Sequence, residues 1–189
     1  HWVLKPPPPA TDNVPRGQRP NMYDNSIKVP TMIRWPGVIR PGTVVKQTVS
    51  NLDWFPTIMA AVGDTDIKER LMAGTTIDGE EYKNHLDGYN QLDYLTGETD
   101  EGARDEFFYI NDDGKIVGQR YENWKVVFKE QRMQGTMGVW AEPFTELRVP
   151  KLFDLRADPY ERADITSNTY WDWVSDHAYL VAPASQEVA

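Results

Sequence analysis

The sequence contains no cysteine, and histidine occurs only three times in 189 residues. The absence of cysteine excludes disulfides and thiolate chemistry within this chain. Basic residues are also scarce, because 20 lysines and arginines stand against 29 aspartates and glutamates and give a formal net charge of −9. Binding to nucleic-acid phosphates needs concentrated basic side chains, so we expect no nucleic-acid partner.

Long apolar runs are missing as well. No stretch approaches the roughly 20 apolar residues that cross a bilayer, so the sequence predicts no membrane span. The start of the chain also lacks the basic region and apolar stretch of a secretory leader. The chain does contain 40% hydrophobic and 12% aromatic residues, which is enough apolar surface for a packed core in one domain or two.

The most informative stretch runs from residue 19 to residue 39. Residues 19–28 are polar and aromatic, which is typical of a loop. Residues 29–35 follow as a short run rich in β-branched and aromatic side chains and lead into Pro36-Gly37, which predicts a strand closed by a turn. A charged loop that leads into a buried strand can hold a side chain at the rim of an α/β sheet.

The next segment predicts an extended stretch followed by a helix. Residues 43–49 have the composition of an edge strand or extended segment. Asp53 is the predicted N-cap of a helix that ends at Gly63. An apolar stripe at helical spacing predicts core packing for this helix, and its members are Phe55, Ile58, Met59 and Val62.

The region from 64 to 97 is acidic and interrupted by glycines, and it predicts only short helical turns at 67–71 and 91–95. Three acidic residues in it could suggest a metal site. Their spacing lacks the pattern of a calcium-binding loop, so we interpret them as a solvated surface; they are Asp78, Glu80 and Glu81.

The pattern changes after the polar run at 98–105, where we place a boundary. Segments rich in strand-forming residues follow, and an Asp-Gly turn at 111–114 joins the first two as a hairpin. An amphipathic helix over 169–181, capped by Asn168, is expected to pack on one face. We therefore predict a four-stranded antiparallel sheet covered by one helix, with strands at 106–110, 115–120, 123–129 and 151–155.

Several of these segments occur in an order that resembles the sulfatase family of the alkaline-phosphatase-like superfamily. Tyr23-Asp24, then Lys28-Val29-Pro30, then Arg34-Trp35-Pro36-Gly37 stand where sulfatases have an aromatic-acid pair, an Arg-x-Pro and a strand that ends in Trp-Pro-Gly. The shared order continues to residue 164. The later matching segments are SNLDWFPT at 50–57, LDGY at 86–89, YLTG at 94–97, NWKVV at 123–127, KLFDL at 151–155 and DPYE at 158–161.

The resemblance implies an α/β fold. Residues 1–100 would be the C-terminal part of the alkaline-phosphatase-like catalytic α/β domain. Residues 101–189 would be a smaller α+β subdomain that contains the antiparallel sheet and its packed helix.

The resemblance also implies where the chemistry lies. Sulfatases use a formylglycine, made from Cys or Ser in a Cys/Ser-x-Pro-x-Arg motif, and a divalent metal, for which calcium is expected. This chain has no match to that motif, and the family places the motif and the metal-binding aspartates upstream of Arg19. We therefore expect this chain to bind no metal or cofactor and to be inactive by itself.

One residue of the chain is a candidate for the site. Counting back from Pro30, Arg19 stands where the family has a sulfate-contacting lysine, and it is our single predicted catalytic residue. Lys28 stands at the Arg of Arg-x-Pro and is expected to pair with Asp24 and fix the loop. His1 lies before a proline run, and we interpret it as a chain terminus and not as a metal ligand.

The function predicted from the resemblance is hydrolysis of sulfate esters by the intact protein, on a sulfated small molecule or a sulfated glycan. Two alternatives remain open: a phosphodiesterase or phosphonate hydrolase of the same superfamily, and a non-catalytic module. The family also suggests a periplasmic or secreted location.

Overall fold

The computed structural model describes residues 22–131 and 141–188. The chain divides into two compact units, one formed by residues 32–107 and the other by residues 1–31 together with 108–189. Arg19 and His1 lie outside the described residues. Whether the whole protein divides into domains at residue 100 stays a prediction.

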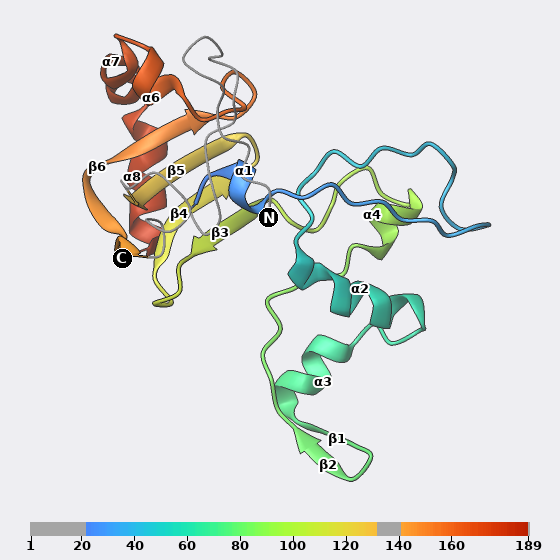
Figure 1. Ribbon diagram of the computed structural model, residues 1–189. Helices are drawn as coiled ribbons and strands as arrows, with labels where there is room; N and C mark the ends of the chain where they lie inside the picture. The colour runs from blue at the N-terminus through green and yellow to red at the C-terminus, as the bar shows by residue number, and fades with distance from the viewer. Residues whose placement is uncertain (1–21, 132–140, 189) are drawn as a thin grey trace. The chain divides into compact units, whose positions relative to one another are not determined.

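A four-stranded sheet forms the centre of the second unit, as predicted (Figure 1). Its strands are adjacent in sequence order, and β5 runs antiparallel to both β4 and β6. Strand β6 begins before the predicted residue 151, because Thr145 and Glu146 pair with the end of β5 beyond a register shift. The strands are β3 (Glu106–Ile110), β4 (Ile116–Tyr121), β5 (Trp124–Glu130) and β6 (Thr145–Asp154).

The single predicted C-terminal helix is in fact two helices, α7 (Tyr170–Asp176) and α8 (Ala178–Val188). The break falls at His177, whose Nδ1–H donates to the Trp173 carbonyl at 2.8 Å beside its own backbone bond to the same oxygen. The predicted cap is also wrong, because the N-cap is Thr169 and not Asn168. A short helix, α6 (Ala163–Thr166), precedes the pair.

Helix α7 packs on the sheet as expected. The Tyr170 hydroxyl donates to the Leu152 carbonyl at 2.9 Å and accepts from the Leu152 N–H at 3.0 Å. Trp173 stacks on Trp124 of β5 with ring centroids 6.2 Å apart. Helix α8 contacts β5 and lies behind the strands in Figure 1, whereas α1 (Asp24–Ile27) lies in front of them. Among the described helices, none is long and apolar enough to cross a membrane.

The unit at 32–107 is built from short elements. The predicted turns at 67–71 and 91–95 are helical, and a two-stranded hairpin adds to them. The hairpin turn at Asp78-Gly79 has φ values of 51° and 89°, the left-handed conformation that Asp-Gly supports, although the sequence was not assigned a hairpin there. The elements are η1 (Asn51–Asp53), α2 (Trp54–Ala61), α3 (Ile67–Ala73), β1 (Thr75–Ile77), β2 (Glu80–Tyr82) and α4 (Leu92–Thr96).

The strand predicted at 29–35 is wrong, and of the two alternatives for residues 43–49 the edge strand is excluded. Residues 28–49 contain no strand, and Met32, in the middle of the predicted strand, is 97% exposed. A strand needs a neighbour to pair with its N–H and C=O groups, and none of the strands that the structure describes pairs with this segment.

One prediction for α2 is confirmed and one is wrong. Asp53 is the N-cap of α2 as predicted, although its side chain makes no capping hydrogen bond to α2 and instead closes the capping box of η1, whose N-cap is Ser50. The apolar stripe is not core here, because Phe55, Ile58 and Val62 are exposed. The helix instead buries Pro56, Thr57 and Ala60. Periodicity identifies an apolar face but does not say what covers it.

Candidate functional site

The predicted site residue Arg19 is followed closely by the first described segment of the chain. Met22, Tyr23 and Asp24 are all buried, although they belong to a loop and the first residue of a four-residue helix. Buried loop backbone needs partners for its polar groups. The contacts of these three residues therefore show what fixes the chain beside Arg19.

Lys125 makes the central contacts. Its side chain is 0% exposed, and its ammonium lies 2.6 Å from the Met22 carbonyl, 2.5 Å from Glu161 Oε1 and 3.2 Å from Asp24 Oδ1. An ammonium has three N–H donors, so these three acceptors satisfy it fully. The ammonium also lies 4.1 Å from the centroid of the Tyr109 ring, a favourable cation–π contact.

The remaining contacts come from the neighbouring strands. The Tyr109 hydroxyl of β3 donates to Asp24 Oδ1 at 2.7 Å, and Arg120 of β4 lies 3.1 Å from Asp24 Oδ2. Asp24, Tyr109, Arg120, Lys125 and Glu161 form one buried network, which we call the Lys125 cluster. Strands β3, β4 and β5 each contribute one member to it.

Glu161 completes the Lys125 cluster from the loop after β6. Its Oε2 accepts the backbone N–H of Asp24 at 2.7 Å, a contact between residues 137 positions apart. Glu161 has φ 54°, in the left-handed region that costs a non-glycine residue about 1–2 kcal/mol. A glycine would avoid that cost but would carry no carboxylate. The Glu161 carboxylate therefore keeps its contacts with Lys125 and Asp24 although the backbone conformation of Glu161 is unfavourable.

The two carboxylates of the Lys125 cluster differ in acidity. Burial acts to raise the pKa of Asp24, but Lys125, Tyr109 and Arg120 outweigh it and hold that pKa below its ordinary value. Burial raises the pKa of Glu161, and Lys125 does not fully offset the rise. Burial and the nearby Asp24 also raise the pKa of Tyr109 well above its usual value, so Tyr109 stays a proton donor.

The predicted pairing of Lys28 with Asp24 is wrong. Lys28 is exposed, and it contacts Asp24 through the backbone, where the Lys28 N–H donates to the Asp24 carbonyl at 2.7 Å. The Asp24 carboxylate instead faces cations from β4 and β5. Sequence proximity favoured Lys28, whereas the fold brings in residues that lie about a hundred positions away.

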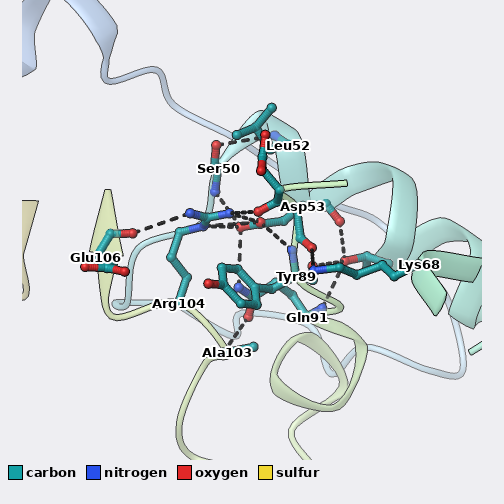
Figure 2. Close-up of polar contacts among 12 residues, drawn as sticks. Ser50, Leu52, Asp53, Lys68, Tyr89, Gln91, Ala103, Arg104 and Glu106 are labelled. Carbon is teal, nitrogen blue, oxygen red and sulfur yellow. Dashed lines mark hydrogen bonds and ion pairs between the residues drawn. The ribbon is translucent and has the colours of Figure 1, made fainter. Parts of the chain in front are cut away.

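A second buried ionic network lies in the unit at 32–107 (Figure 2). Asp53 is 0% exposed, and Arg104 donates to it in a bidentate manner, with Nη2 2.6 Å from Oδ1 and Nε 3.0 Å from Oδ2. Backbone N–H groups of Ser50 and Tyr89 donate to the same carboxylate at 2.8 and 2.9 Å. We call Ser50, Asp53, Tyr89, Gln91 and Arg104 the Asp53 cluster.

The Asp53 cluster joins three segments, at 50–53, 87–91 and 103–106. The Arg104 guanidinium also donates to the Asp87 carbonyl at 3.1 Å and lies 4.7 Å from the Tyr89 ring centroid. Burial acts to raise the pKa of Asp53, but the Arg104 and backbone hydrogen bonds hold it below its ordinary value. Gly88 lies so close to η1 that a Cβ there would be 2.0 Å from the Leu52 carbonyl oxygen.

Neither cluster has the composition of a metal centre. Within residues 22–131 and 141–188, no group of three or more histidine or acidic side chains is placed to hold a metal ion. Each carboxylate of the two clusters is instead bound by cations or N–H groups of the protein itself. The arrangement holds loops in place, and it does not present an open coordination site.

Sequence reasoning missed the partners in both clusters. The sequence predicts Asp53 only as a helix cap and indicates no role for Arg104, and it presents Lys125 and Glu161 only as parts of the NWKVV and DPYE segments. The one available signal is chemical: Lys125 stands in the run 124–128, which is otherwise apolar, and a lysine there is buried only if it is paired.

Comparison with known proteins shows that the chain is similar to several sulfatases. The rat (Rattus norvegicus) steryl-sulfatase is 28% identical over 175 residues, which is 85% of this chain and 28% of the relative. Human (Homo sapiens) arylsulfatase D is 25% identical over 189 residues, 87% of this chain and 30% of the relative. The ulvan-active sulfatase of Formosa agariphila is 27% identical over 170 residues, or 77% and 30%. The chain thus spans about 30% of the length of these relatives.

A solved structure agrees in fold. The crystal structure of PsFucS1 sulfatase from Pseudoalteromonas sp. matches with a TM-score of 0.66 at 19% identity, over 92% of this chain and 32% of that protein. The family model described as N-sulphoglucosamine sulphohydrolase, C-terminal, matches residues 18–178. Since this match covers most of the chain, the chain belongs to that family and corresponds to the C-terminal region of the sulfatases that it matches.

Proposed function

We propose that the full-length protein containing this chain hydrolyses sulfate esters of a small molecule or a glycan. The family match over residues 18–178 carries this proposal. The names of the related steryl-, aryl- and ulvan-active sulfatases support it, and their different substrates leave the sulfated compound open. A periplasmic or secreted location belongs to the same proposal.

The nucleophile and the metal are proposed for parts of the protein outside this chain. Family resemblance supports a formylglycine and a divalent metal, with calcium as the expected ion. The chain has no cysteine, and the residues that the structure describes hold no group of three suited to a metal. They do not fit the metal, so we derive no step through it.

Arg19 is the residue of this chain proposed to act on the substrate. Negative charge develops on the sulfate oxygens as the ester bond breaks, and a fixed cation there stabilises the transition state more than the ground state. The proposal is supported by the position of Arg19 relative to Pro30 and to the Tyr23-Asp24 pair, which matches the lysine of the family motif. An arginine keeps the charge but presents a wider fork of donors.

The test uses the full-length protein and a chromogenic aryl sulfate, with and without chelator. Arg19→Ala should lower kcat on the order of a hundredfold and affect KM less, as expected for loss of one donor to a developing oxyanion. Arg19→Lys should recover much of the loss. Arg16→Ala, in the same stretch of sequence, is the matched control and should change little.

Two outcomes would contradict the proposal. If Arg19→Ala stays within about twofold of wild type, far from the loss expected for an oxyanion donor, Arg19 does not contact the sulfate. If the full-length protein cleaves aryl phosphates, phosphodiesters or phosphonates and leaves sulfates intact, the alternative phosphoester or phosphonate chemistry holds instead.

A further inference from the structure

The Lys125 cluster binds backbone atoms as well as side chains. The Lys125 ammonium binds the Met22 carbonyl at 2.6 Å, and the Glu161 carboxylate binds the Asp24 N–H at 2.7 Å. These two contacts fix the path of the backbone on either side of Tyr23. Met22 follows Arg19 by three residues in the sequence, so Met22–Asp24 is the described segment nearest to the proposed catalytic residue.

Stability alone does not account for this arrangement. Burying two carboxylates and an ammonium has a large desolvation cost, and apolar residues of similar volume often stabilise a fold equally well. Glu161 adds the cost of a left-handed backbone. Charged groups with fixed acceptors instead hold the backbone in one defined geometry. Each N–H of Lys125 has a single acceptor position.

We propose that Lys125 and Glu161 are positioning residues for the sulfate-binding loop and act through Met22–Asp24 on Arg19. The antiparallel sheet would then have a specific task, which is to hold a catalytic loop that belongs to the other end of the chain. This inference rests on the proposed function of Arg19, and it goes further by naming the groups that keep Arg19 in place.

The expected effect is kinetic. A misplacement of about 1 Å at a reacting centre can lower a rate about a hundredfold. Lys125→Met should therefore lower kcat on aryl sulfate by about 30- to 100-fold, with a smaller change in KM, because the contact of Arg19 is strongest in the transition state. Glu161→Gln keeps the shape of the side chain but cannot accept from both donors, so it should lower kcat less.

A double-mutant cycle in the full-length protein tests the route of this effect. If Lys125 acts through Arg19, Lys125→Met should cost little further once Arg19→Ala is present, so the two losses in kcat are far from multiplicative. Multiplicative losses would overturn the proposal, because a purely structural lysine would weaken both backgrounds equally. If Lys125→Met does not fold, Glu161→Gln takes its place in the cycle.

Two matched controls accompany the cycle. Lys129→Met removes a lysine from the same strand, outside the Lys125 cluster, and should leave kcat within about twofold. Arg104→Met breaks a buried ion pair of the other unit, at the Asp53 cluster, and should lower stability without the selective loss in kcat.

A readout without turnover separates this inference from the proposed function. Hydrogen exchange measured on peptides that cover residues 17–27 should be faster in Lys125→Met than in wild type and unchanged in Lys129→Met. If exchange rises but the wild-type protein cleaves no sulfate, the anchor holds and the proposed function fails. If exchange does not change, the anchoring itself is wrong, whatever the activity.

Discussion

The Asp53 cluster and the Lys125 cluster are both buried and both ionic, but they balance charge differently. Asp53 has one guanidinium that matches both of its oxygens, and backbone N–H groups complete its shell. In the Lys125 cluster, Arg120 pairs with Asp24, and one ammonium is shared by Asp24 and Glu161. The acidities of the carboxyl groups differ accordingly. The pKa values of Asp53 and Asp24 are lowered, whereas the pKa of Glu161 is raised.

The two clusters also differ in how far apart in the sequence their members lie. Asp53 and Arg104 are 51 positions apart and join neighbouring segments of one unit, whereas Asp24 and Glu161 are 137 positions apart. A short-range, fully neutralised pair suits the assembly of loops. A long-range cluster with a shared cation suits the fixing of one segment on a sheet. The comparison can be tested by changing one charge at a time.

The largest effect is expected from Arg104→Met. It leaves the Asp53 carboxylate buried without a cation, a change that typically costs about 3–5 kcal/mol in the free energy of unfolding. Urea unfolding of the full-length protein, followed by tryptophan fluorescence, measures it. The double variant Asp53→Leu/Arg104→Met should recover part of the loss, because no uncompensated charge remains. A single-variant loss below about 1 kcal/mol would show that the pair behaves like a surface ion pair.

A smaller expected effect is the pH dependence of the free energy of unfolding, which should differ between the two clusters. Asp53 has a lowered pKa in the folded state, so its contribution to stability is complete above its ordinary pKa of 3.8 and is lost as the pH falls through the folded value. Glu161 has a raised pKa, so its contribution declines as the pH rises from 4.5 towards the folded value.

The corresponding variants should change opposite limbs of the stability profile. Asp53→Asn should flatten the loss of stability in acid, and Glu161→Gln should flatten the decline above pH 4.5. Urea midpoints between about pH 3 and about pH 7 give both slopes. Parallel profiles for the two variants would mean that the clusters do not differ in the way proposed.

The smallest effect comes from a matched pair of strained positions. Glu122 and Glu161 have φ values of 48° and 54°, but Glu122 is exposed whereas Glu161 is buried. Glu122→Gly should leave stability within about 0.5 kcal/mol or raise it, because glycine relieves the strain. Glu161→Gly should lower it despite the same relief. Equal thermal midpoints for the two variants would deny any role to the Glu161 carboxylate.

Local patterns predicted much of the fold. Residues 106–130 were predictable because each strand is rich in strand-forming side chains and the Asp-Gly turn joins the first two as a hairpin. The break at His177 escaped prediction because an amphipathic stripe continues across it. The strand expected at 29–35 failed because pairing depends on a partner, which the local sequence does not contain.

The candidate site was less predictable for a related reason. Arg19 could be proposed only from a family motif, and it lies outside the described residues. Lys125 could be suspected as a charge in the apolar run at 124–128, but nothing near it in sequence names Met22, Asp24 or Glu161 as its acceptors. Its contacts with Met22 and Asp24 span more than a hundred positions, and such contacts depend on the topology of the fold and not on the local sequence.

The distance between Asp24 and Glu161 also sets an order of assembly during synthesis. The Asp53 cluster can close once residue 104 has left the ribosome, but the Asp24 N–H has to wait until residue 161 has emerged. Contacts of such long sequence separation form slowly because the intervening loop must close first. Residues 22–24 are therefore among the last parts of this region to acquire their final contacts, and a nascent chain that stops before residue 161 leaves the Asp24 N–H without its Glu161 acceptor.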